Sequence, residues 1–294
     1  MEGKIIKAIA GFYYIHAGAA GIYACRARGI FRKDGIKPLV GDNAAFEVLS
    51  EEKKEGNLTE VLPRKNMLIR PAAANIDQAL VIFALREPDP NLNLLDRFLI
   101  YMGMQQIPVI IYFNKDDLDR NKTAEKYRAV YEAAGYTLIF GSVKEGNADA
   151  VRKQLRGKTT VLAGPSGVGK SSLTNLLHAE ERMEVGALSE RIKRGKQTTR
   201  HTELFMLEEN TYLLDTPGFT SLSLPGLPAA EVKEFFPEFS EYAGECKFAG
   251  CLHIQEQEGI CGVKRALSKG LIRQERYENY LQIYEEQKKA ERRY

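Results

Sequence analysis

Residues 159–178 read TTVLAGPSGVGKSSLTNLLH, which is a strand-like apolar run, a glycine-rich loop and a helix-forming run in succession. The loop matches the pattern G-x-x-x-x-G-K-[ST], and a strand before it and a helix after it are the context that this pattern requires. Its glycines let backbone N–H groups surround an anion, and the helix N-terminus adds a partial positive charge. We therefore predict a phosphate site formed by Gly164, Pro165, Ser166, Gly167, Val168, Gly169, Lys170, Ser171 and Ser172.

Two side chains of this loop and a second motif have predicted roles around the phosphates. Lys170 is expected to reach the β- and γ-phosphates and to act in catalysis, and the Ser171 hydroxyl is expected to bind Mg²⁺. Further along the chain, Asp215-Thr-Pro-Gly218 follows the strand-like run TYLLD and matches D-x-x-G. Asp215 would hold Mg²⁺ through its water shell, and the Gly218 N–H would sense the γ-phosphate, a catalytic role. An ordinary turn is the alternative for these residues.

The motif NKDD at residues 114–117 follows the apolar run PVIIYF and predicts that the bound base is guanine. The Watson–Crick edge of guanine presents two donors, and the ionised Asp117 carboxylate can accept from both. Adenine offers no such pair, so its binding would leave the carboxylate unsatisfied. Asn114 can bond elsewhere on the base, the Lys115 stem can lie along its ring, and Asp116 belongs to the same binding loop.

Three further positions complete the predicted nucleotide site. Ser142 follows the strand-like run YTLIF and can present a backbone N–H to the guanine carbonyl. Thr198 and Thr199 lie in the basic stretch RIKRGKQTTRHTEL and are candidates for a switch threonine on Mg²⁺. Thr199 is also a candidate catalytic residue. A solvated loop without such a role is the alternative for this stretch.

The order of these motifs along the chain is informative. In a Ras-like domain the phosphate loop comes first and N-K-x-D late, whereas here residues 114–117 precede residues 164–171. Strand-like and helix-like runs alternate over residues 72–225, which predicts a mainly parallel sheet with ligands at the carboxyl ends of its strands. All the motifs can surround one nucleotide if the usual termini are joined and new ones opened. We therefore predict a circularly permuted α/β P-loop GTPase domain over residues 72–225.

The N-terminal segment, residues 1–71, contains short strand-like runs such as FYYIH and AAFEVLS, separated by glycines. Such strands without a helical pattern predict a small β-barrel, of which the OB-fold is one candidate. The segment carries 12 Lys and Arg against 8 Asp and Glu. Cationic residues cluster in it together with two aromatic residues, which suits backbone and stacking contacts to RNA, although solubilising charge is the alternative for each residue. These residues are Tyr23, Arg26, Arg28, Phe31, Arg32, Lys33 and Lys37.

The C-terminal segment, residues 226–294, is predicted to be a helical module around a Cys/His cluster. Cys246, Cys251, His253 and Cys261 place three thiols and one imidazole within 16 residues, which suits one tetrahedral Zn²⁺ per chain. Three free buried thiols and a surface histidine are the alternative. The last stretch, LIRQERYENYLQIYEEQKKAERRY, is predicted to be an amphipathic helix whose charges form a solvated face.

Membrane and secretory classes have no support in this sequence. Its apolar runs are shorter than the roughly 18 residues that span a bilayer. The N-terminus, MEGKIIKAIAGFYYI, lacks a clear signal-peptide pattern. We therefore expect a cytoplasmic protein with no membrane partner, whose four cysteines are reduced thiols.

On these residues, the chain resembles the RsgA (YjeQ/YloQ) family of small-ribosomal-subunit-dependent GTPases over nearly its whole length. The motif order and the Cys-Cys-His-Cys spacing carry the resemblance. It implies an N-terminal OB-fold, Zn²⁺ on the Cys/His cluster, and GTP or GDP held by residues 114–117 and 164–172. It also implies a late role in maturation of the small ribosomal subunit, contacts to its rRNA, and hydrolysis stimulated by that subunit. We expect the chain to act as a monomer.

Two positions bear on how water attacks the nucleotide. The family's switch loop usually reads G-R-H-T-T, whereas residues 195–199 read GKQTT. Gln197 therefore replaces a histidine implicated in hydrolysis and can still orient water, so it is a candidate catalytic residue. Phe219 fits the family pattern, but it stands where Ras-type enzymes have a water-orienting glutamine. Intrinsic hydrolysis is therefore expected to be slow, with the missing group supplied elsewhere or by a partner.

A ribosome-activated GTPase is the leading hypothesis, and two other classes are open. In an RNA-binding chaperone, GTP would gate binding and hydrolysis would be incidental, which Phe219 and Gln197 allow. A GTP-dependent RNA-modifying enzyme would need a second catalytic constellation, and the sequences of the barrel and C-terminal segments supply none. Hydrolysis measured with and without small subunits separates the first two classes.

Overall fold

The computed structural model describes residues 1–27, 37–69, 71–120, 122–185, 202–215 and 222–292, the side chains of residues 179–185 excepted. The chain divides into two units. The first comprises Met1–Leu80, Gly146–Ala163 and Gly169–Gly218, and the second comprises Val81–Glu145, Gly164–Val168 and Phe219–Tyr294. The first unit thus contains the N-terminal strands, and the second contains the guanine loop and the C-terminal helices.

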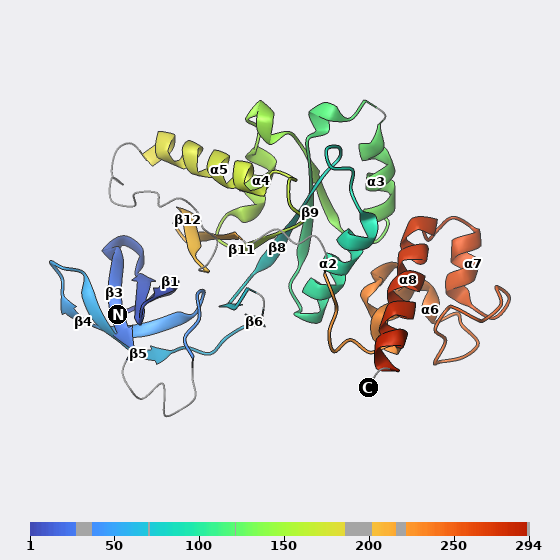
Figure 1. Ribbon diagram of the computed structural model, residues 1–294, viewed down its shortest axis with the longest axis horizontal. Helices are drawn as coiled ribbons and strands as arrows, with labels where there is room; N and C mark the ends of the chain where they lie inside the picture. Colours follow the sequence, from blue (N-terminus) through green and yellow to red (C-terminus); the bar gives the residue numbers. More distant parts are fainter. Residues whose placement is uncertain (28–36, 70, 121, 186–201, 216–221, 293–294) are drawn as a thin grey trace. The chain divides into compact units, whose positions relative to one another are not determined.

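The N-terminal strands close into a barrel, which confirms the predicted β-barrel (Figure 1). The order around the barrel is β1-β2-β3-β5-β4, with β3 and β5 parallel and the other pairs antiparallel. This order, in which β3 pairs with β5 rather than β4, is compatible with the Greek-key OB-fold. The strands are β1 (Glu2–Ile9), β2 (Phe12–His16), β3 (Ile22–Ala27), β4 (Asn43–Ser50) and β5 (Glu55–Val61), with the 3-10 helix η1 (Gly18–Ala20) after β2.

Alternating side chains fill the barrel. In β4, Ala44 and Phe46 are buried while Asn43 and Glu47 are exposed, as a strand with one core face requires. The Tyr23 ring packs on Phe46 with 5.0 Å between ring centroids. The prediction that Tyr23 stacks on RNA is therefore wrong, because its ring belongs to the barrel core. The core residues are Ile5, Ile15, Tyr23, Cys25, Ala44, Phe46 and Leu58.

The central strands form a six-stranded sheet in the order β10-β9-β8-β11-β13-β12. The pairs β9–β10 and β11–β13 are parallel and β12 is an antiparallel edge strand, which confirms a mainly parallel sheet. Strands β8 and β11 are buried throughout, so polar and apolar residues do not alternate along them. The strands are β8 (Gln78–Ala84), β9 (Val109–Asn114), β10 (Thr137–Phe140), β11 (Thr159–Ala163), β12 (Leu204–Glu208) and β13 (Thr211–Asp215); β6 (Met67–Leu68) and β7 (Ala73–Ala74) form a separate ladder.

Two of the helices that connect these strands begin at side-chain caps. Asn91 Oδ1 accepts from the Leu94 N–H at 3.0 Å at the start of α2. The Asp119 carboxylate accepts from the N–H groups of Thr123 and Ala124 at 2.9 and 2.8 Å at the start of α3. Such caps satisfy donors that the first helical turn leaves unpaired. The helices are α2 (Leu92–Met104), α3 (Thr123–Tyr131), α4 (Asp149–Leu155) and α5 (Lys170–Val185), with 3-10 turns η2 (Asp116–Leu118) and η3 (Val143–Glu145).

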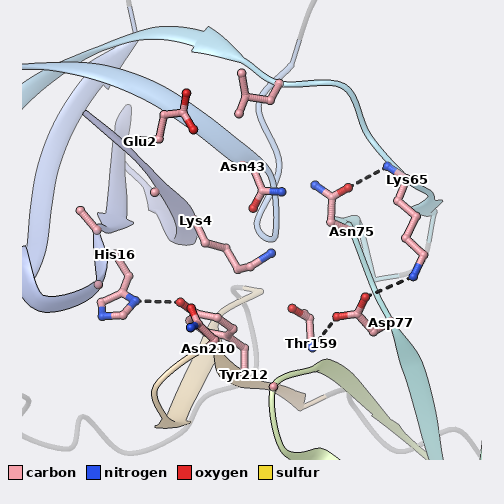
Figure 2. Close-up of a pocket in the computed structure, with 15 residues that line it drawn as sticks. Glu2, Lys4, His16, Asn43, Lys65, Asn75, Asp77, Thr159, Asn210 and Tyr212 are labelled. Atoms are coloured by element: carbon pink, nitrogen blue, oxygen red, sulfur yellow. Dashed lines mark hydrogen bonds and ion pairs between the residues drawn. The ribbon is translucent and has the colours of Figure 1, made fainter.

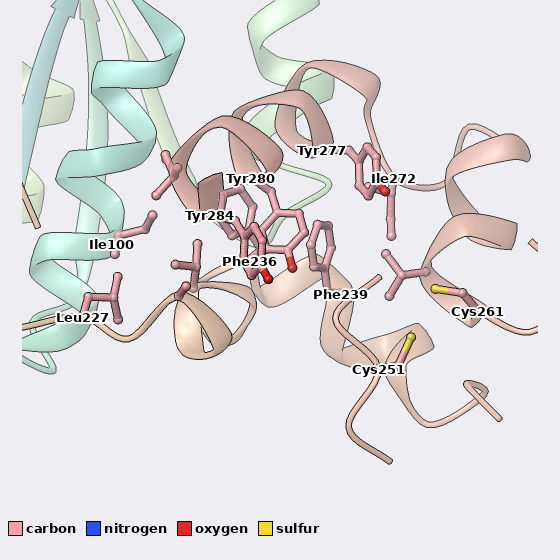
Figure 3. Packing of buried hydrophobic residues seen from close by; sticks show 14 of the residues in the cluster. Ile100, Leu227, Phe236, Phe239, Cys251, Cys261, Ile272, Tyr277, Tyr280 and Tyr284 are labelled. Carbon is pink, nitrogen blue, oxygen red and sulfur yellow. The ribbon is translucent and has the colours of Figure 1, made fainter. Parts of the chain in front are cut away.

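The C-terminal helices share a hydrophobic core that includes Ile100 of α2 (Figure 3). At its centre, the Phe239 ring lies edge-on to Tyr280 with 5.2 Å between centroids, and stacks on Phe236 at 5.3 Å. The predicted helical module is therefore confirmed. Its elements are η4 (Ala229–Phe235), α6 (Pro237–Ala243), α7 (Gly262–Ser268) and α8 (Gln274–Glu291).

A buried charge cluster fastens α8 to its neighbours. The Arg276 side chain is 2% exposed, and its guanidinium donates to both oxygens of Glu238 at 2.7 and 3.1 Å and to Asp96 at 2.5 Å. Asn279 and Tyr131 donate to the same Asp96 carboxylate at 2.6 and 3.0 Å. The predicted solvated charge face of the last helix is therefore wrong at Arg276, because carboxylates from α2 and α6 meet this side chain in the core.

Replacing Arg276 by Ala is expected to lower the free energy of unfolding by roughly 3–5 kcal/mol. Burial alone would lower the pKa of Arg276, but Asp96 and Glu238 outweigh it and raise that pKa well above its usual value. Without the guanidinium, both carboxylates would be left in the core with no cation. Urea unfolding followed by tyrosine fluorescence measures the loss. Arg292→Ala, at the exposed C-cap position at the other end of the same helix, is the control, and an equal loss in both variants would contradict this role.

Candidate functional site

The phosphate loop leaves β11 through backbone conformations that exclude side chains. Gly164 has φ +138°, and a Cβ there would lie 2.2 Å from the Ile82 carbonyl oxygen. Gly167 and Gly169 also have positive φ, of +81° and +99°, which L-residues rarely adopt. The glycines of the motif are therefore required by the geometry of the loop, as in other anion-binding turns.

Asn114, at the end of β9, links three loops of the second unit. Its side-chain oxygen accepts from the Val143 N–H at 3.0 Å, and its amide donates to the Val168 carbonyl at 2.8 Å. Asn114 is buried, as is Ser142, whose hydroxyl has no hydrogen-bond partner among the described residues. The Asn114 amide therefore holds the guanine loop against the phosphate loop, a structural role that the motif by itself does not reveal.

The guanine loop exposes one of its two adjacent carboxylates. Lys115 has a left-handed backbone with φ +62°, and its ammonium donates to the Glu87 carbonyl. Asp116 is half-buried, and burial followed by the charges of Glu145 and Asp117 raises the pKa of Asp116. Asp117 is exposed. Of the two carboxylates, Asp117 is therefore the one more accessible to a base.

Lys170 and Asp215 belong to the first unit. Lys170 begins α5 and is 8% exposed. Burial lowers the pKa of its ammonium, while the negative charge of Asp215 at the end of β13 opposes that shift. Ser171 is exposed. The residues predicted to bind the phosphates and Mg²⁺ thus lie at or after the carboxyl ends of β11 and β13, which are neighbouring parallel strands.

Several predicted residues lie outside the described part of the chain. In the nucleotide site these are Gln197, Thr198, Thr199 and Gly218, together with Phe219. In the basic and aromatic group of the barrel they are Arg28, Phe31, Arg32 and Lys33. The roles of all these residues stay predictions.

The described residues contain a set of side chains that could hold a metal ion, namely Cys246, Cys251, His253 and Cys261. Their ligand atoms all lie within 4.8 Å of one another. His253 Nδ1 lies 3.6 Å from Cys246 Sγ and 3.3 Å from Cys261 Sγ, and these two sulfurs are 4.0 Å apart. A tetrahedron with Zn–S bonds of about 2.3 Å has sulfur–sulfur edges of roughly 3.8 Å. The spacing therefore fits a tetrahedral ion.

Side chains of three surrounding elements hold four successive carbonyls of the ligand loop, residues 251–254. The donors come from η4, α7 and α8, and two of them are the tyrosines in Figure 3. From residue 251 to residue 254 they are Lys233 at 3.1 Å, Tyr280 at 2.5 Å, Tyr277 at 2.6 Å and Lys264 at 2.6 Å. The loop is thus anchored to the module core, so ligand geometry and helix packing depend on each other.

Backbone N–H groups and burial act in opposite directions on the thiols of the cluster. The Gly262 N–H donates to Cys246 Sγ at 3.3 Å, and the Lys264 N–H donates to Cys261 Sγ at 3.4 Å. Burial raises the pKa of the Cys251 thiol to about 12 and lowers the pKa of His253. The imidazole is therefore neutral at pH 7, as a metal ligand must be, and a divalent cation would stabilise the thiolates.

The residues that support the cluster carry no recognisable motif. Tyr277, Tyr280 and Tyr284 recur at helical spacing, which indicates a buried face. Nothing in that spacing points to carbonyls 24 and 28 residues earlier in the chain, to which Tyr277 and Tyr280 donate. The amphipathic pattern therefore predicts a helix that packs, but not what it packs against.

A mainly parallel sheet with a guanine loop after β9, and a phosphate loop after β11 that comes later in the chain, defines a circularly permuted P-loop GTPase. Family models described as the RsgA GTPase and the RsgA N-terminal domain match residues 61–225 and 2–58. The chain belongs to the RsgA family of GTPases, which confirms the resemblance seen in its motifs.

Curated relatives and solved structures match nearly end to end. A protein of Agathobacter rectalis named small ribosomal subunit biogenesis GTPase RsgA is 51% identical, with 99% of this chain and 100% of that protein covered. A protein of the same name from Alkaliphilus metalliredigens is 46% identical, with 99% of each covered. The circularly permuted GTPase YloQ has a TM-score of 0.80 at 38% identity, over 98% of this chain and 95% of that one. YjeQ from Thermotoga maritima has a TM-score of 0.82 at 28% identity, over 97% and 98%.

Each helix in the described ranges is too short or too polar to cross a bilayer. All four cysteines are free thiols. Three of them belong to the Cys/His cluster, and the fourth, Cys25, is buried in the barrel core.

Proposed function

We propose that this chain is a GTPase of late small-ribosomal-subunit maturation, which binds the rRNA of the subunit and hydrolyses GTP when the subunit stimulates it. The observation that carries the proposal is the end-to-end match to proteins named for small ribosomal subunit biogenesis, at 51% and 46% identity. The nucleotide motifs are intact in this chain. GTP and GDP are therefore its ligands, and the small subunit is its partner.

In this function, two loops of the second unit recognise the base. Asp117 accepts from the two donors of guanine, and its exposure leaves it available for that pair. Asn114 keeps the guanine loop against the phosphate loop through its bond to Val168. Ser142 contributes its backbone N–H to the guanine carbonyl. Residues 164–172 hold the phosphates.

Side chains of the phosphate loop and of later motifs bind Mg²⁺ and act in the reaction in this proposal. Ser171 and Thr199 bind Mg²⁺ directly, and Asp215 holds its water shell. Lys170 stabilises the negative charge on the transferred phosphoryl group, and its position near the Asp215 carboxylate supports this role. Gln197 orients the attacking water, because Phe219 cannot.

The barrel supplies contacts to RNA in this proposal. Arg26 is exposed, and its guanidinium lies 4.8 Å from the centroid of the Phe12 ring. A cation over an aromatic face gives a surface on which an unpaired base can stack. Lys37 is exposed as well and can meet a phosphate.

The Cys/His cluster holds one structural Zn²⁺ in this proposal. Three thiolates and one imidazole fill a tetrahedral shell and leave no position for a substrate. The one cysteine of the barrel, Cys25, is a free thiol, which fits a reducing compartment. In this proposal the chain acts in the cytoplasm, and as a monomer.

GTP hydrolysis by the purified chain, alone and with purified small subunits, tests the proposal. Slow turnover is expected for the chain alone, and an acceleration on the order of 10²-fold with subunits, the scale of a correctly positioned water. Lys170→Ala, which removes the phosphate-binding ammonium, controls for GTPases that contaminate the subunits. Equal rates with and without subunits would contradict ribosome activation. Nucleotide-dependent RNA binding under those conditions would favour the chaperone hypothesis instead.

A further inference from the structure

The barrel contacts the β12–β13 hairpin within the first unit. Strand β1 pairs with β4 over Glu2–Lys4, and beyond that stretch Lys7 forms an antiparallel bridge with Glu203. The Lys7 ammonium also meets both carboxylate oxygens of Glu203, at 3.1 and 3.0 Å. The two side chains are 33% and 31% exposed, so water only partly screens their attraction.

A second contact joins β2 of the barrel to β13 (Figure 2). His16 Nδ1 and the Tyr212 hydroxyl oxygen are 2.7 Å apart, and both side chains are buried. The Lys4 ammonium lies 5.6 Å from the centroid of the Tyr212 ring. Two side chains of the barrel thus meet one side chain of β13 on a route independent of the Lys7–Glu203 pair.

A polar cavity of about 560 Å³ lies beside these contacts. Figure 2 shows the Lys4 ammonium in its interior, near the amides of Asn43 and Asn75, with Asp77 and Thr159 along one side. The core of the barrel itself is apolar and closely packed. Because this cavity is polar and not closely packed, widening it costs little packing energy. The barrel can therefore shift on the hairpin while its own fold stays intact.

The barrel contacts on the hairpin lie close to Asp215, a predicted residue of the nucleotide site. Its ladder pairs Leu204 with Leu214, so the next position along that register places Glu203 opposite Asp215. Antiparallel strands hold such partners about 5 Å apart at Cα. Tyr212 lies on the same strand as Asp215, whose charge acts on Lys170. A displacement of the hairpin therefore moves the Asp215 carboxylate.

We propose that the β12–β13 hairpin transmits the position of the barrel to Asp215, and that Lys7 and Glu203 are positioning residues for the stimulation of GTP hydrolysis by the subunit. The proposal rests on the proposed function, in which RNA binds the barrel and the subunit stimulates hydrolysis. RNA that shifts the barrel at the polar cavity moves the hairpin, and with it the carboxylate that holds the Mg²⁺ water shell.

Charge reversal of the Lys7–Glu203 pair tests this coupling. Lys7→Glu is expected to leave the rate without subunits unchanged and to lower the rate at saturating subunits about fivefold. The subunit concentration for half-maximal stimulation should not change, because the altered contact does not face RNA. The double variant Lys7→Glu/Glu203→Lys restores the pair with exchanged charges, and should recover stimulation to within about twofold of the unaltered chain.

Two further variants complete the experiment. Lys53→Glu makes the same charge change at an exposed position of the β4–β5 turn and should retain full stimulation. Lys7→Gln removes the charge without reversing it and should lose part of the stimulation even if the reversal unfolds the barrel. Full stimulation of both Lys7 variants, or a double variant no better than Lys7→Glu, would overturn the coupling. Absence of stimulation in the unaltered chain would instead overturn the proposed function.

Discussion

Asp117→Asn is expected to reverse the base preference of the nucleotide site. The affinity for GTP should fall roughly 10³-fold, about 4 kcal/mol, and the affinity for XTP should rise. The Asp117 carboxylate only accepts hydrogen bonds, which matches the N1–H and 2-amino donors of guanine, whereas asparagine offers one acceptor and one amide donor. That amide opposes the 2-amino group of guanine but pairs with the carbonyl that xanthine has in its place.

Equilibrium binding of fluorescent GTP and XTP analogues measures both affinities. Asp149→Asn is the matched control, because it makes the same substitution at an exposed carboxylate in the first turn of α4. That variant should keep the original preference for GTP. If Asp117→Asn also still preferred GTP, Asp117 would not read the base. The half-buried Asp116, whose pKa burial raises, would then be the next carboxylate to change.

Removal of the metal is expected to unfold the C-terminal module. Structural zinc contributes on the order of 10 kcal/mol of binding free energy to folding. Without the cation, the ligand loop 251–254 loses the constraint that keeps its carbonyls in front of Lys233, Tyr280, Tyr277 and Lys264. The loss reaches the core through Phe239, whose ring lies edge-on to both His253 and Tyr280, with centroids 5.8 and 5.2 Å apart.

Elemental analysis and near-UV circular dichroism together test this expectation. The chain has 14 tyrosines and no tryptophan, so the near-UV signal reports tyrosine packing. One zinc per chain is expected, with loss of signal and a lower thermal midpoint after chelation. Cys251→Ser should lose the metal, whereas Cys25→Ala, which removes a thiol buried in the barrel, should keep it. A metal-free chain with an unchanged spectrum would contradict a structural zinc site.

The chemistry of the candidate site could be predicted where it is local in the chain. Gly164 is required because its φ is +138° and because the Ile82 carbonyl leaves no space for a Cβ, and the loop motif already specifies a glycine there. The four candidate metal ligands lie within 16 residues, so their spacing alone indicates a tetrahedral set. Local backbone geometry and short loops thus made these residues recognisable.

The fold could be predicted at the level of its classes but not of its side-chain contacts. Continuous apolar runs such as residues 78–84 indicate buried parallel strands, and β8 is buried throughout. The residues next to Tyr23 in the sequence do not show whether its ring faces the core or the solvent. Only the closed barrel places that ring in the core. Arg276 likewise has the sequence context of a surface arginine, yet it meets Asp96 and Glu238.

The sequence by itself determined which residues are predicted to carry the nucleotide and metal chemistry and in which order they come, because each motif is local in the chain. Only the tertiary structure decided how those parts are held. The Asn114–Val168 bond joins residues 54 positions apart, and the Lys7–Glu203 pair joins residues 196 apart. Partners so distant are selected by how whole strands and helices pack. No local pattern of charge or hydrophobicity specifies which of the many possible pairs will form.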